Sequence, residues 1–287
     1  MTNVDQFESA FKSAAKATYT HETIELKRCF VLCDLKDEQA QSYFEQVKLS
    51  AKYLACANTP IDWHLLDGNT FDTVGEMIGL IDENSPDLIF TYRNLHSTAW
   101  RWPYSLGAYV DVLTQVVKCP VMLLPHPSES DTPKQLPPNA VMAMTDHLTG
   151  DDQLVNWALA ATPVDRQLLL THVENQISFD AMIETISRVP AIDTDIARDE
   201  ILQQKLKEPR DYITACKTGI AKAEADENLS IVDIVTTGRL LEEYKRLIKE
   251  HNVELLVMNT KDEDQLAMHG LAYPLAVELR DIPMLLL

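Results

Sequence analysis

Several ionisable side chains stand at or beside the ends of apolar runs of strand length. They are Asp34, Asp146, His147 and His172. Open parallel sheets bind ligands at the carboxyl ends of their strands, so we predict that these residues bind a ligand. An aspartate at such a place could equally cap the helix that follows, and this alternative stays open for both aspartates.

His147 and His172 would end neighbouring strands, with Asp146 beside them. Two histidines and one carboxylate form a familiar metal-binding set. The spacing is not a metal signature, however, and His172 also fits a simple strand end. We therefore assign no metal ligand and keep a metal-binding regulator as the weaker alternative.

A second group of candidates lies in loops that follow apolar runs. The first part of the chain contributes Arg93, Asn94, His96, Arg101 and Gly107, and the second part contributes Gly238, Asn259 and Gly270. The loop from 93 to 107 is cationic and could hold an anion, such as a nucleotide phosphate. Packing of a long loop over the edge of the sheet is the alternative.

The chain lacks familiar catalytic motifs. It has no serine in a G-x-S-x-G setting, no HExxH pair and no GxxxxGK[ST] phosphate loop. Its five cysteines form no CxxC pair, which favours reduced and mostly buried thiols. We expect a protein without catalytic residues and without a required cofactor.

Apolar runs alternate with segments of helical period, the pattern of a parallel sheet built from βαβ units. Strands are predicted at 28–35, 61–66, 87–91 and 119–124, and again at 140–145, 167–173, 231–236, 254–258 and 282–287. Segments 178–189 and 199–223 are predicted to be helical, with Pro209 breaking or kinking the second. A linker rich in proline and serine separates the two groups of strands.

The expected organisation has four parts. Residues 1–27 form an N-terminal extension, expected to be helical, and residues 28–126 form the first domain. The linker covers 127–138, and the second domain covers 139–287 with a helical insertion at about 175–229. An internal repeat supports this division: Gly107 and Gly270 each stand 13 residues before a proline, at an offset of 163.

The strand-end aspartates differ by only 112 positions, so the second domain carries about 51 extra residues. The first domain is therefore predicted to be abridged by one strand and its helix. The comparison assigns the strand at 167–173 as the one without a counterpart.

Composition restricts the partners. The formal net charge is −19, of which the first 138 residues carry −7 and the remainder −12, with no compensating basic cluster. Such a field repels nucleic acid and anionic lipid surfaces. Neither a signal peptide nor a membrane-spanning segment is evident, so we expect a cytoplasmic protein.

Order and spacing together resemble the universal stress protein family. The matching pieces are VLCDL, AMTDH, LLLTHV, DLIFT, ELLVM, CPVMLLP and the C-terminal IPMLLL. The resemblance implies an α/β fold of two tandem doubly wound, adenine nucleotide alpha hydrolase-like domains, and an adenine-side contact for the strand-end aspartates. The chain departs from the glycine loop of ATP-binding members, since Asp262, Glu263 and Asp264 occupy the phosphate position of the second domain.

The resemblance implies a non-catalytic stress-response or signalling protein that binds a partner or a small ligand. The main alternative is an ATP-binding, slowly hydrolysing protein that uses the first-domain pocket. The two domains are expected to pair through their last strands, 119–124 and 282–287, because an uncovered apolar edge invites aggregation. A homodimer is a further candidate.

Overall fold

The computed structural model describes residues 17–54, 60–101, 104–127, 136–145, 150–223, 229–260 and 271–287. The first part contains β1 (Arg28–Leu32), α2 (Asp37–Ser50), η1 (Lys52–Leu54), β2 (Asp62–Leu66), α3 (Val74–Asn84), β3 (Leu88–Tyr92), η2 (Thr98–Arg101), α4 (Ala108–Val116) and β4 (Val121–Leu124). The second part contains β5 (Ala140–Thr145), α5 (Asp152–Ala160), β6 (Gln167–Asn175), α6 (Gln176–Ser187), α7 (Thr194–Ala223), β7 (Ser230–Gly238), α8 (Leu240–Glu250), β8 (Leu255–Met258), α9 (Ala272–Glu278) and β9 (Met284–Leu286).

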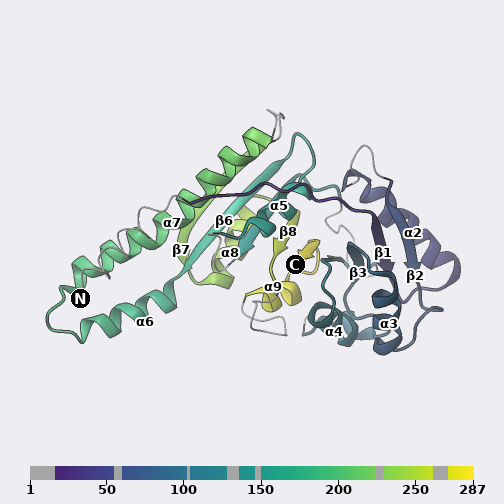
Figure 1. Cartoon of the computed structure of the whole chain (residues 1–287). Helices are drawn as coiled ribbons and strands as arrows, with labels where there is room; N and C mark the ends of the chain where they lie inside the picture. The colour runs from purple at the N-terminus through teal and green to yellow at the C-terminus, as the bar shows by residue number, and fades with distance from the viewer. Residues whose placement is uncertain are drawn as a thin grey trace.

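All these strands join one sheet, in the order β2-β1-β3-β4-β9-β8-β5-β6-β7 (Figure 1). Every neighbouring pair is parallel except β4 and β9, which run antiparallel. Apolar runs fill the central strands because such strands are covered by helices on both faces. The α/β fold class predicted from the sequence is confirmed.

The antiparallel contact of β4 with β9 forms a seam at the middle of the sheet. Met122 lies opposite Leu285, and these residues are 163 positions apart, the offset of the internal repeat. Val121 faces Leu286 while Leu123 faces Met284, so each strand meets its own counterpart in a self-complementary register. The predicted pairing of the last strands is confirmed.

One strand assignment was wrong. Within the sheet β2 pairs with β1 as β6 pairs with β5, so β6 does have a counterpart in the first part. The strand without a counterpart is β7, which pairs with the outer side of β6. The alignment of the two halves by their apolar runs was wrong at this strand, because such runs do not reveal which strands are neighbours in the sheet.

Helices cover the sheet on both faces. One core joins α3 and α4 to α8 and α9, through Met77, Val110, Leu247 and Leu275 among others. The opposite core joins α2 to α5 and α7, including Phe44, Trp157, Tyr212 and Ile213. On this second face the described helices leave a gap over the seam, where Met122 and Leu285 line a pocket.

An N-terminal segment covers that gap. Residues 17–27 contain no helix, so this part of the predicted helical extension was wrong. The segment crosses the face of the molecule from α7 to β1 (Figure 1). Its amides bind side chains instead of forming helical turns: Thr20 N–H donates to Asp152 at 2.9 Å, and Lys27 N–H donates to Asp87 at 2.8 Å.

Helix α7 continues through Pro209 as one helix of 30 residues, so the predicted break is wrong. A proline inside a helix costs about 3 kcal/mol. Pro209 is buried, and packing of the neighbouring Tyr212 and Ile213 against the body offsets that cost. Among the described helices none is both long and apolar enough to span a membrane.

Candidate functional site

Asp34 follows β1 at the carboxyl edge of the first part, as predicted. Both of its carboxylate oxygens are already used inside the protein. One accepts the hydroxyl of Tyr92, and the other accepts the backbone N–H of His96 at 2.8 Å. Asp34 therefore ties the loop after β3 to the end of β1.

Tyr92, which the sequence analysis missed, is the last residue of β3. Its ring is fully buried and meets Tyr43 at 5.4 Å and His126 at 4.8 Å between centroids, edge to face. Burial, followed by the Asp34 carboxylate, raises the pKa of the Tyr92 hydroxyl, which therefore remains a hydrogen-bond donor. The run DLIFT continues directly into Tyr92, and a polar aromatic side chain at a strand end was the available signal.

His126 lies beside this ring, also unpredicted, and is buried. Burial lowers the pKa of His126 to about 4; the nearby Arg93 and Arg280 also lower it, whereas Asp34 raises it. The imidazole is therefore neutral at physiological pH. Asp34, Tyr92 and His126 fill the strand edge with side chains that already contact one another.

The loop after β3 closes on itself. Asn94 is buried, has φ of 62°, and donates its N–H to the Leu106 carbonyl at 2.7 Å. Gly107 has φ of 88°, and a Cβ there would lie 2.8 Å from the Asn94 Cα. The glycine is thus needed for close approach to Asn94, and this contact accounts for it without a phosphate.

Arg93 points away from the loop and into the second part of the chain. Only 2% of its surface is exposed. Its guanidinium donates to the Ala276 carbonyl at 2.8 Å and to the Arg280 carbonyl at 3.0 Å, at the end of α9. An arginine near a helix C-terminus satisfies carbonyls that lack helical partners. Because these contacts hold Arg93 within the fold, its removal is expected to lower stability.

The other predicted residues of the loop lie nearer the solvent. His96 is exposed and contacts Tyr109, with ring centroids 5.0 Å apart. Arg101 is also exposed. The structure therefore brings Asp34, His96 and the buried Asn94 together, while Arg93 is directed elsewhere.

The equivalent edge of the second part is described only in part. Asp146, His147 and Gly270 lie outside the described residues, as do the three acidic residues at 262–264. Asn259, at the end of β8, donates to Asp151 at 2.6 Å. Asp151 in turn accepts the Leu154 N–H and caps α5, and burial raises the pKa of Asp151. Gly238 ends β7, close to the Glu243 side chain.

His172 is buried on β6. Its Nε2 lies 3.8 Å from a Glu174 oxygen, and the other Glu174 oxygen accepts from Lys205 of α7 at 2.8 Å. Within the described ranges, no group of three or more metal-binding side chains is present. The predicted set with Asp146 and His147 lies partly outside those ranges.

The thiols of the described core are protonated. Burial raises the pKa of Cys29, Cys33 and Cys216 to about 12 in each case. A thiol is a poor nucleophile and a poor metal ligand until it loses its proton. These cysteines therefore act as small apolar residues.

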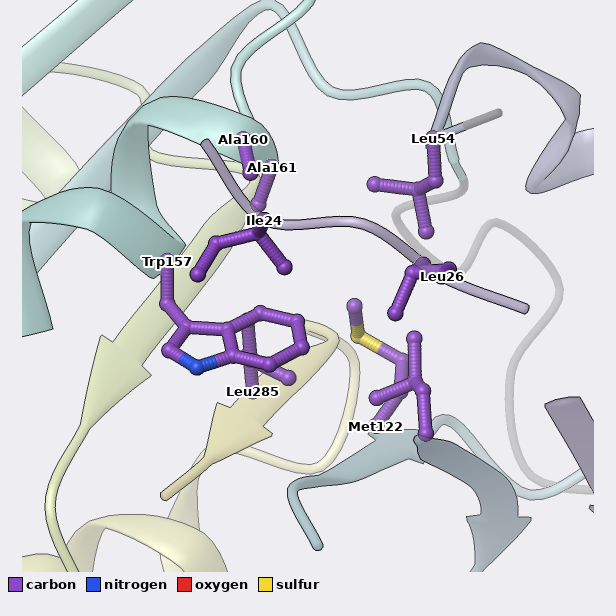
Figure 2. Close-up of a pocket in the computed structure, with 9 residues that line it drawn as sticks. Ile24, Leu26, Leu54, Met122, Trp157, Ala160, Ala161 and Leu285 are labelled. Atoms are coloured by element: carbon purple, nitrogen blue, oxygen red, sulfur yellow. The ribbon is translucent and has the colours of Figure 1, made fainter. Parts of the chain in front are cut away.

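An apolar pocket lies over the seam, beneath the N-terminal segment (Figure 2). Its interior has room for about one water-sized molecule. Its lining residues are Ile24, Leu26, Leu54, Leu88, Met122, Trp157, Ala160, Ala161 and Leu285. Met122 and Leu285 are the two residues at the centre of the seam. We call this the seam pocket. The sequence analysis missed it because it forms between segments far apart in the chain.

Comparison with known proteins gives a likeness of fold. By sequence, no family model and no curated protein matches the chain. Among solved structures, the functionally unknown protein PA1789 from Pseudomonas aeruginosa PAO1 is similar, with 12% identity and a TM-score of 0.51 over 91% of this chain and 92% of that one.

Two further solved structures are similar at lower TM-scores. A protein from Pseudomonas aeruginosa UCBPP-PA14 with a provisional universal stress designation has 14% identity and a TM-score of 0.48, over 91% of this chain and 93% of that one. A universal stress protein from Archaeoglobus fulgidus DSM 4304 has 13% identity and a TM-score of 0.42, over 91% and 85%.

Proposed function

We propose that this chain is a non-catalytic stress-response or signalling protein of the universal stress type that acts by binding. Its ligand is a small, uncharged apolar molecule or an apolar side chain of a partner, and the seam pocket is the binding site. The observation that carries the proposal is the lining: every one of its side chains is apolar, and they come from both halves and the N-terminal segment. Ligand sites are usually apolar and concave but much larger than the seam pocket, so a ligand fits only if part of the lining moves.

The N-terminal segment makes the site adjustable. Ile24 and Leu26 enter the pocket from the segment, while Trp157 and Met122 belong to the body (Figure 2). A ligand larger than the present pocket enters by displacing Ile24 and Leu26 of the N-terminal segment. In this proposal the seam arises from repetition of one α/β unit along the chain. Strands β4 and β9, which meet at the seam, occupy equivalent places in the two halves.

The nucleotide alternative receives less support. Binding of ATP in the first half would place the nucleotide beside an Asp34 carboxylate that already accepts the Tyr92 hydroxyl and the His96 amide, which use about half of its acceptor positions. It would require the loop at 94–107 to open, although Asn94 and Gly107 hold it closed.

Titration with N-phenyl-1-naphthylamine, an uncharged apolar fluorophore, tests the proposed site. We expect saturable fluorescence enhancement with the wild-type protein. Ala160→Leu fills the pocket and weakens binding about tenfold, whereas Leu26→Ala enlarges it and strengthens binding. Ala181→Leu, on the exposed surface of α6, is the matched control and leaves binding unchanged.

Two results would overturn the proposed site. One is an absence of saturable enhancement in the wild type. The other is equal affinity of the wild type and Ala160→Leu, since a probe in the seam pocket contacts that position.

A further inference from the structure

The two outer edges of the sheet differ in length and in charge. Strand β2 has five residues, and its Asp62 forms ion pairs with His64 at 2.8 Å and with Arg28 at 3.4 Å. Short, charged edges discourage pairing with another chain. Strand β7 has nine residues, SIVDIVTTG, with Asp233 as its single charge. That charge is neutralised by an ion pair with Lys217 of α7.

Strand β7 presents an outer row of backbone groups. Ser230 donates its N–H to the Arg166 carbonyl at the start of the ladder with β6. Successive residues of a strand direct their backbone groups to alternate sides. The N–H and C=O groups of Ile231, Asp233, Val235 and Thr237 therefore point away from β6. In the part of the chain that is described, no strand pairs with this outer side.

We infer that β7 is a dimerisation edge, and that it pairs antiparallel with β7 of a second copy of this chain. The strand is self-complementary about its central residue, Ile234. In that register each residue lies opposite the one equally far on the other side of Ile234, so Ile231 meets Thr237 and Asp233 meets Val235. All outward groups are then satisfied, by about eight hydrogen bonds.

The charges favour the same register. A shift that places Asp233 opposite Asp233 would put like charges directly against each other, which is destabilising. With Ile234 at the centre, Asp233 lies opposite Val235 and only diagonal to Asp233 of the second copy, and each carboxylate keeps its own Lys217. The chain already contains one pairing of this geometry, since β4 and β9 join antiparallel at equivalent residues.

The arm formed by α6 and the first part of α7 points to a partner at the same edge. It projects from the sheet on the side of β7 (Figure 1). Its exposed aliphatic side chains are Ile177 (63%), Val189 (45%), Ile192 (44%) and Ile196 (58%). These exposed side chains belong to an arm on the same side of the sheet as the β7 edge, so a second copy docked on β7 would lie beside that arm.

Thr237→Pro tests the pairing in the full-length protein. Proline removes one outward N–H and no hydrogen bond to β6, so the fold tolerates it at an edge. Light scattering after gel filtration should give twice the chain mass of 32.4 kDa for the wild type. The dimer dissociation constant should rise at least about tenfold in Thr237→Pro. Thr237→Val keeps the amide and should remain dimeric.

Thr237→Glu is the second variant, because it places a carboxylate diagonal to Asp233 of the second copy without changing the backbone, and it should also be monomeric. Should Thr237→Pro fail to fold, as judged by circular dichroism, Thr237→Glu decides the question. A monomeric wild type at high micromolar concentration overturns the inference. So does a folded Thr237→Glu that dimerises as tightly as the wild type.

Discussion

Equivalent strand ends in the two halves hold very different residues. Tyr92 stands beside Leu124 at the end of β3, while Asn259 directly follows Met258, the residue paired with Leu286. In the first half the next residue is Arg93, which binds carbonyls at the end of α9 across the seam. In the second half it is Thr260, which donates its N–H and its hydroxyl to the Leu287 carbonyl.

In the first half, the side chains at the carboxyl edge of the sheet therefore hold parts of the fold together. Its charged and polar groups hold α9, the loop after β3 and the end of β1 together. The seam itself is symmetric in register, yet the contacts that reinforce it come mainly from one side. Breaking the first-half contacts should therefore harm the whole molecule.

Arg93→Met should have the largest effect on the free energy of unfolding. It removes a buried guanidinium and leaves carbonyls of α9 without donors, at a cost of about 3 kcal/mol or more. Urea denaturation measures the loss. Arg101→Met is the control, since an exposed arginine changes stability by about 0.5 kcal/mol or less. Equal midpoints for the two variants would contradict the role of Arg93.

Thr260→Ala tests the position of the second half that is equivalent to Arg93. Removal of its hydroxyl takes away one hydrogen bond to Leu287, so we expect a loss of about 1 kcal/mol in the same urea experiment. A loss as large as that of Arg93→Met would show that the two strand ends contribute equally.

Gly107→Ala should destabilise by about 2 kcal/mol, because its φ is positive and the added Cβ meets the Asn94 backbone. Gly79→Ala is the matched control: it lies on the exposed face of α3 with open space around it, and alanine there stabilises by about 0.5 to 1 kcal/mol. Thermal unfolding followed by circular dichroism compares the two. A tolerated alanine at 107 would remove the close approach to Asn94 as the reason for the glycine.

Tyr92→Phe should cost about 1 to 2 kcal/mol, since it removes the hydroxyl that Asp34 accepts while the ring stays in place. Tyr104→Phe, at a tyrosine that is 78% exposed, serves as the control and should leave the unfolding midpoint unchanged. Indistinguishable midpoints for the two variants would mean that the Asp34 contact contributes nothing to stability.

His126 predicts a pH dependence. Its pKa is about 4 in the folded protein and about 6.5 when unfolded, so between these values the unfolded chain binds more protons. Stability from this group is present above pH 6.5 and is lost as the pH falls toward 4. Urea unfolding of His126→Phe should show a shallower decline over this window. Parallel pH curves for the variant and the wild type would exclude His126 as the cause.

Much of the fold follows from the sequence because its signals are local. Apolar runs identified the strands, and the offset of 163 agrees with the register in which Met122 faces Leu285. The candidate site was harder to predict from the sequence. Asp34 and Gly107 lie where the pattern indicates, but nothing local shows that Asp34 accepts from Tyr92.

The missed features depend on distant contacts. Arg93 meets carbonyls of a helix in the other half, and the seam pocket joins residues from Ile24 to Leu285. The extended segment at 17–27 is held by side chains of α5 rather than by its own propensity. Such contacts appear only once the elements are placed in space.

The internal contacts of Asp34, Tyr92 and the loop after β3 are expected to keep a nucleotide out of the first-half strand edge. Native mass spectrometry of the purified full-length protein, before and after addition of Mg-ATP, tests this expectation. We expect no copurifying nucleotide and no ATP complex at millimolar ligand. A one-to-one complex with a dissociation constant in the low micromolar range would contradict it.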